Sequence, residues 1–244
     1  MSTPLVLYGK DGEQWNKYIA ADQRWPLGTK LVLQDGREYR FAKAGAAALV
    51  IGDLLQAPAN VANDVGRAGI ATAVGSYAPT LTLGGATTAN LYAEGYWMIA
   101  VANAAAAGGG DTHKIDNHLA GTTAMVFNLA MYNALRTAID TTTRVALIQN
   151  PYAGVIQVPV TTPTGICVGV AQSAVALTGF GWIQIKGMAA VLTSGTVTLG
   201  APVAAIAVAG AVGPIAAIAT QPPVGFCQRV AAGAAWSTIQ LNLP

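Results

Sequence analysis

The feature that most constrains the fold is a rhythm of short β-type runs in the last third of the chain. From Pro151 onward, runs rich in β-branched and aromatic residues alternate with Gly, Pro, Ser and Thr breakers about every 8–12 residues. The runs expected to form strands are 154–160, 167–171, 181–186, 195–199 and 237–243. Closely spaced short strands of this kind predict a β-sandwich or small barrel over 151–244.

The clearest local signal is a hairpin over residues 30–43. Two alternating runs flank Asp35-Gly36, a pair that suits a tight primed turn because it tolerates positive φ. Alternation places Leu31 and Leu33 on one face of the first strand and Tyr39 and Phe41 on one face of the second. This segment closes an N-terminal region expected to span 1–45.

The residues before the hairpin have no clean period and carry scattered aromatic side chains. This pattern suits an extended arm anchored by a few rings, or else a short amphipathic helix over residues 14–21. Either element could dock on a neighbouring protein. We therefore expect Trp15, Tyr18 and Trp25 to bind a partner.

The middle region, 46–150, is also expected to be mainly β. Strand-like runs occur at 54–56, 80–83 and 95–102. Over 123–149, Met125, Leu129 and Leu135 keep a helix-like spacing, but the runs 124–129 and 144–149 are strand-like and are the preferred interpretation. The apolar stretch 203–219 is broken by Gly and Pro, so we expect two buried strands there and not a membrane span. The whole chain is thus predicted to be all-β with little helix.

Charge is sparse and unevenly distributed. Only 10% of the 244 residues are charged, against about 25% in a typical soluble protein, and the net charge is +2. A net charge of this size is too small to indicate nucleic-acid binding. No Asp or Glu follows Arg144, so the last hundred residues lack the carboxylates of an acid–base pair or a hard-cation site. The low charge indicates surface that is covered in an assembly; a compact protein with a Ser/Thr/Asn/Gln surface is the alternative.

Few residues are candidates for chemistry. Asp111, His113, Asp116 and His118 form the one cluster of titratable ligands, which would suit a metal or acid–base site. The spacing matches no helix face with paired histidines, so a polar loop leading into a strand, with His118 hydrogen-bonded near the core, is favoured. Cys167 and Cys227 have apolar neighbours and are expected to be free buried thiols. We predict no catalytic residue, no metal ligand and no cofactor.

Several segments resemble virion structural proteins of tailed bacteriophages, in particular capsid decoration (cement) proteins. The resemblance runs from about Gly28 to the C-terminus and is carried by 33–45, 48–58, 89–96, 169–171 and 181–187. It implies an all-β homo-oligomer, a dimer or trimer, that sits outside the major capsid lattice and braces the shell. The family offers no catalytic residues to carry over.

The expected partners are therefore the major capsid protein and further copies of this chain, with no nucleic acid and no membrane. The expected location is the capsid exterior, after synthesis in the host cytoplasm. A tail, neck or head-fibre protein is the alternative. A virion-surface carbohydrate-binding module or a hydrolase is a third; a hydrolase would depend on Asp111, Asp116 or His118.

Overall fold

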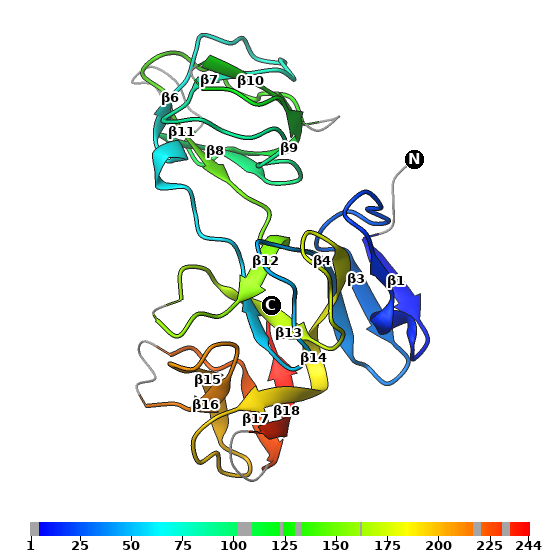
Figure 1. Cartoon of the computed structure of the whole chain (residues 1–244). Helices are drawn as coiled ribbons and strands as arrows, with labels where there is room; N and C mark the ends of the chain where they lie inside the picture. Colours follow the sequence, from blue (N-terminus) through cyan, green and yellow to red (C-terminus); the bar gives the residue numbers. More distant parts are fainter. Residues whose placement is uncertain are drawn as a thin grey trace. The chain divides into compact units, whose positions relative to one another are not determined.

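The regular secondary structure of the computed structural model is almost entirely β-strand, and the described residues add two short 3₁₀ turns, η1 (Glu13–Trp15) and η2 (Ala62–Asp64) (Figure 1). The structure describes residues 5–101, 109–122, 124–129, 133–161, 163–216, 221–230 and 235–244. The all-β prediction is confirmed. The chain forms two compact units: Met1–Ala59 together with Pro151–Pro244, and Asn60–Asn150.

The first unit contains one large sheet. Its strands are β1 (Val6–Gly9), β2 (Lys17–Tyr18), β3 (Lys30–Leu33), β4 (Glu38–Ala44), β5 (Leu54–Gln56), β12 (Ala153–Gln157), β13 (Cys167–Ala171), β14 (Phe180–Thr193), β15 (Pro202–Ala205), β16 (Val212–Pro214), β17 (Gly225–Arg229) and β18 (Ala235–Asn242). They follow the order β1-β3-β4-β12-β5-β13-β14-β16-β15-β17-β18, and β2 pairs with β14.

Two extra pairings turn this sheet into two closed rings that share β14. The pairing of β4 with β14 closes the ring β4-β12-β5-β13-β14, and the pairing of β14 with β18 closes the ring β14-β16-β15-β17-β18. The first half of the 14-residue β14 pairs with β4 over Phe180–Lys186 and the second half pairs with β18 over Lys186–Thr193. Ring closure leaves few edges exposed.

Each part of the sheet has its own apolar core. One cluster comprises Ala42, Ala44, Leu49, Leu55, Ala57, Val155, Val168, Ala171, Val175 and Ile183. A second comprises Leu54, Val158, Val170, Ala189, Val191, Val197, Val203, Val212, Val224, Cys227, Ile239 and Leu241. A third lies on the hairpin and contains Leu31, Leu33, Tyr39, Phe41, Phe180 and Trp182. The small Ala and Val side chains of the first two clusters fit the narrow interior of five-stranded rings.

The hairpin forms as predicted, but its turn differs. Leu31 pairs with Tyr39, and all four predicted apolar side chains are buried. The Leu33 N–H donates to the Arg37 carbonyl at 2.9 Å, so the loop has three residues. Gly36 alone has positive φ (83°), whereas a primed turn would need it at Asp35 too. The connection is therefore a three-residue loop with a left-handed Gly.

The second unit is a curled six-stranded sheet. Its strands are β6 (Arg67–Ala68), β7 (Thr80–Thr82), β8 (Tyr96–Val101), β9 (Thr112–His118), β10 (Ala124–Leu129) and β11 (Arg144–Ile148), in the order β6-β11-β8-β9-β10-β7. The two ends meet at a bridge between Gly69 and Leu81. The core inside is Leu81, Leu83, Tyr92, Trp97, Ile99, Ile115, Met125, Phe127, Leu129, Leu135, Ile139, Val145 and Leu147.

Two expectations need correction. The division at residue 45 is not a unit boundary, because β4 pairs with β12 and β14 from the far end of the chain; residues 46–59 also belong to the first unit. The run 195–199 forms no strand. The amphipathic helix over residues 14–21, the alternative to an extended arm, does not form; this stretch contains the end of the 3₁₀ turn η1 and the short β2. By contrast, 124–129 and 144–148 are strands, as preferred over the helical alternative.

Candidate functional site

The three aromatic residues predicted to bind a partner are presented differently. Trp15, at the end of η1, is 55% exposed. Tyr18 packs edge-on against Phe41, with ring centroids 5.9 Å apart, and Trp25 packs on the same hairpin core. Trp15 is thus the one of the three that offers most of its side chain to a partner. Tyr18 and Trp25 fix the arm to β4 and β14.

Further apolar side chains of the arm are exposed. Leu5, Tyr8 and Ile19 are all more exposed than Trp15, and Tyr8 reaches 85%. Tyr8 lies on β1, which pairs in parallel with β3 at the end of the sheet. The alternation in β1 that turns Leu7 inward and Tyr8 outward was too short to recognise in the sequence.

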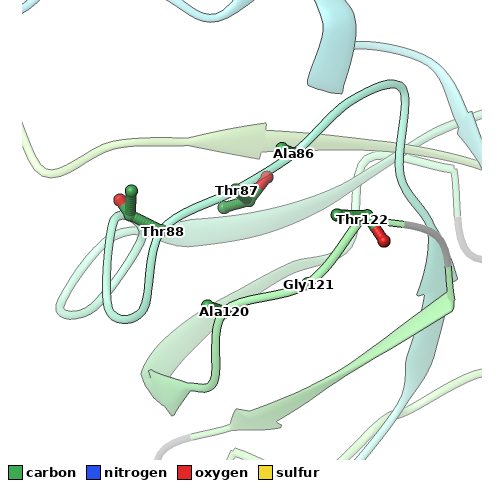
Figure 2. Close-up of a pocket in the computed structure, with 6 residues that line it drawn as sticks. All are labelled: Ala86, Thr87, Thr88, Ala120, Gly121 and Thr122. Atoms are coloured by element: carbon green, nitrogen blue, oxygen red, sulfur yellow. The ribbon is translucent and has the colours of Figure 1, made fainter.

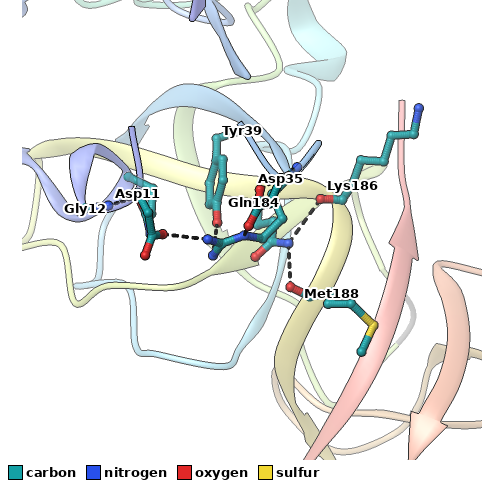
Figure 3. A network of polar contacts seen from close by, with 9 residues as sticks. Asp11, Gly12, Asp35, Tyr39, Gln184, Lys186 and Met188 are labelled. Carbon is teal, nitrogen blue, oxygen red and sulfur yellow. Dashed lines mark hydrogen bonds and ion pairs between the residues drawn. The ribbon is translucent and has the colours of Figure 1, made fainter. Parts of the chain in front are cut away.

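A polar network ties the arm to the hairpin (Figure 3). The Arg37 guanidinium donates to Asp11 Oδ1 at 2.5 Å, to Asp35 Oδ2 at 2.5 Å and to the Tyr39 hydroxyl at 3.1 Å. Hydrogen bonds from Gln14 and then Arg37 lower the pKa of Asp11. The backbone N–H of Arg37 is the main cause of the lowered pKa of Asp35. These contacts hold the loop after β1 against the β3–β4 turn.

The same region contains the bulge at which β14 passes from one ring to the other. Gly187 has φ 88°, and a Cβ there would lie 2.9 Å from Arg37 Cγ. The buried Gln184 side chain donates to the carbonyls of Lys186 (3.1 Å) and Met188 (2.9 Å), on either side of Gly187 (Figure 3). The backbone around Gly187, just after the bulge between Gln184 and Lys186, is therefore fixed by side-chain hydrogen bonds on one side and by Arg37 on the other.

The outer face of the second ring carries a second group of exposed apolar side chains. Cross-strand pairs share a face of a sheet. The register aligns Trp236 with Leu192, and Gln240 with both Met188 and Phe226. Trp236 is 57% exposed, and Phe226 and Met188 are about half exposed. We call Met188, Leu192, Phe226, Trp236 and Gln240 the ring face.

The position of Trp236 depends on a glycine. Its Nε1–H donates to the Ile51 carbonyl at 3.4 Å, and its indole lies over Gly52 so closely that a Cβ would be 2.1 Å from Nε1. Ile51 and Val50, which precede this glycine, are also about half exposed. The five strands of the second ring contain no acidic residue, and a large aromatic side chain held on such a surface is typical of a protein-binding site.

The predicted titratable cluster lies on β9 and is split between two faces. His113 and His118 point inward and are buried, whereas Asp116 is exposed. The His118 Nε2 accepts the Tyr92 N–H at 3.0 Å, and its Nδ1 donates to the Leu119 carbonyl at 2.8 Å. Burial lowers the pKa of His118. Its ring is thus neutral and occupied by backbone partners, in agreement with the hydrogen-bonded interpretation, although the segment is strand throughout.

A buried polar pair near His118 was not recognised in the sequence. The Tyr92 hydroxyl donates to Asp64 Oδ2 at 2.5 Å, and both residues are buried. Burial and this bond raise the pKa of Tyr92. Nothing within either local segment indicates the contact, since the residues are 28 positions apart. In the described ranges, no three His, Cys, Asp or Glu side chains are placed to hold a metal ion.

An open hollow lies between two loops of the second unit (Figure 2). It has a volume of about 460 Å³ and is lined by Ala86, Thr87, Thr88, Ala120, Gly121 and Thr122. The loops are joined by paired backbone hydrogen bonds between Thr87 and Gly121, at 2.8 and 3.0 Å. Its lining supplies methyl groups, hydroxyls and backbone, and no charged side chain.

The two cysteines are free, as expected. Cys227 is buried and Cys167 is partly buried, and burial raises the pKa of Cys167 to about 11. A thiol with such a pKa is a poor nucleophile near neutral pH.

Comparisons with known proteins do not place the chain in a family. No family model, no curated protein and no solved structure matches the chain. Among the described residues, no helix is long and apolar enough to span a bilayer. What the geometry offers is apolar surface on the arm and on the ring face, suited to contact with another protein.

Proposed function

We propose that this chain is a virion structural protein that binds the assembled major capsid lattice and stabilises the phage head, as a decoration or cement protein. The exposed aromatic and aliphatic side chains of the arm and of the ring face are the observation that carries the protein-binding part of the proposal. The resemblance of residues 28–244 to phage virion proteins supports the choice of partner.

Two separate surfaces suit attachment to a repeating shell. The arm presents Trp15 and Ile19, and the ring face presents Trp236 and Phe226. Weak contacts become strong when they are repeated by symmetry or made by one molecule to two neighbours. A cement protein of this kind needs such contact points more than it needs a deep polar pocket.

The test compares particles with and without the protein. Heads that lack it should rupture at lower temperature or milder osmotic shock, and added protein should restore resistance. Trp15→Ser should reduce retention on sedimented particles by about tenfold or more, because a buried aromatic anchor contributes about 2 kcal/mol. Tyr77→Ser is the matched control, since Tyr77 is similarly exposed on the second unit. Equal rupture of both kinds of head would refute the proposal.

Copy number separates this role from a tail, neck or head-fibre role. A shell protein should be present in numbers on the order of hundreds per particle, since it follows the lattice symmetry. A dozen or fewer copies on a stained gel of purified virions would favour the alternative.

A further inference from the structure

The structure leaves one edge of the first unit's sheet open, at the four-residue strand β1. Among the described residues, β1 pairs with β3 on one side and with no strand on the other. The Lys30 N–H donates to the Leu5 carbonyl at 2.9 Å, so the polar groups of Leu5 and Leu7 face β3. By alternation, the N–H and C=O groups of Val6 and Tyr8 point away from the sheet. Such an edge is a template for a further strand.

The β1 edge lacks the features that usually prevent pairing. Proteins protect edges with Lys, Pro, bulges or inward charges. The strand Val6–Gly9 contains none of these, and its outward side chains Val6 and Tyr8 are exposed. The other strands of this sheet, apart from the two-residue β2, each have neighbours on both sides. The opening is therefore specific to β1.

We propose that β1 pairs antiparallel with β1 of a second copy of this chain, about a two-fold axis at Leu7. In this register Val6 lies opposite Tyr8 of the second copy, and the outward N–H and C=O groups of these residues form four hydrogen bonds. Two Val–Tyr pairs then lie side by side on one face, a combination of β-branched and aromatic residues that stabilises sheets.

The sequence of the strand favours a second copy over a foreign strand. A two-fold contact must be self-complementary, and this holds when Val6 of each copy lies opposite Tyr8 of the other. Residues 5–9 carry no charged side chain, so no like charges lie opposite each other. An interface made by one short strand per copy falls below the ~1,000 Å² of a permanent dimer. The dimer is therefore weak and reversible, with a dissociation constant on the order of 10–100 µM.

The experiment is sedimentation equilibrium of the full chain across that concentration range. The wild type should shift from 24.8 kDa toward twice that mass as concentration rises. Val6→Lys with Tyr8→Lys places ammonium groups opposite each other and should stay monomeric. Val6→Lys with Tyr8→Glu is the matched control: it changes the same exposed positions but aligns opposite charges, so it should dimerise.

Two outcomes would overturn the proposal. One is a wild type that stays monomeric throughout; if the Lys/Lys variant then also lost particle binding, β1 would be assigned to a strand of a foreign protein. The other is a Lys/Lys variant that still dimerises, which would place the contact elsewhere. The mass measurement needs no capsid, so its result is independent of the proposed cement role.

Discussion

At the scale of single residues, the interior of the second unit combines an aromatic core with a buried histidine whose two ring nitrogens have backbone partners. The His118 ring packs against the rings of Tyr92 and Phe127, with centroids 5.8 and 5.0 Å away. Both of its nitrogens are committed to the backbone in the neutral form. Protonation would add a charge in a buried place and remove the acceptor for the Tyr92 N–H.

This arrangement predicts acid sensitivity in the second unit. Burial lowers the pKa of His118 below the ordinary histidine value of about 6.5, so the unfolded chain takes up the proton first as pH falls. The contribution of neutral His118 to the free energy of unfolding is fully present above about pH 6.5. It declines below that pH, by at most about 1.4 kcal/mol per pH unit. Hydrogen exchange of the backbone amides in β8 and β9, followed between pH 7 and pH 5, measures this loss of stability.

His118→Asn is the informative variant, because its amide can still donate to the Leu119 carbonyl but does not titrate. It should be less stable at pH 7 and show a shallower decline toward pH 5 than the wild type. The lowered carboxyl pKa values, such as that of Asp140 at about 2, act only at lower pH. An unchanged slope in the variant would rule out His118 as the cause.

At the scale of elements, β14 determines how the first unit is built. It joins two rings, and the change of partner occurs at Lys186, directly after a register irregularity between Gln184 and Lys186. The next residue, Gly187, has φ 88°. Gly187→Ala should lower the free energy of unfolding by about 2 kcal/mol, since a left-handed conformation costs an L-residue ~1–2 kcal/mol and the new Cβ crowds Arg37. Urea denaturation measures the loss.

Ala190→Val is the matched control on the same strand. Ala190 is exposed, and its φ is not positive, so a β-branched side chain there should change stability by no more than about 0.5 kcal/mol. If Gly187→Ala were as stable as this control, the left-handed position after the bulge would not require glycine.

Local patterns were enough to predict most strands but not their partners. The hairpin and the run 167–171 were found because alternation and breakers are properties of neighbouring residues. Pairing of β4 with β14 joins residues about 140 positions apart, and no local signal encodes it. The exposure of Tyr8 and Trp236 was missed for the same reason: which side of a strand is covered depends on elements elsewhere.

At the scale of the whole molecule, the second unit is an insertion. Residues 60–150 lie between β5 and β12, which pair with each other in the first unit. Every member of the second unit's core comes from within the insertion. The two strands that flank the insertion, β5 and β12, are thus held together by hydrogen bonds within the first unit. This is expected for a domain inserted into a surface connection.

A self-contained core predicts that residues 60–150 fold without the rest of the chain. Trp97 is the sole tryptophan in this segment and is fully buried, so it reports folding directly. The isolated segment should show blue-shifted Trp97 emission that moves to the red in one cooperative step with urea. Phe127→Ala should lower the segment's free energy of unfolding by about 3–5 kcal/mol, because Phe127 is buried and packs edge-on against Trp97, with ring centroids 5.5 Å apart. Solvent-exposed emission from the segment without urea would mean that the first unit is needed to fold the insertion.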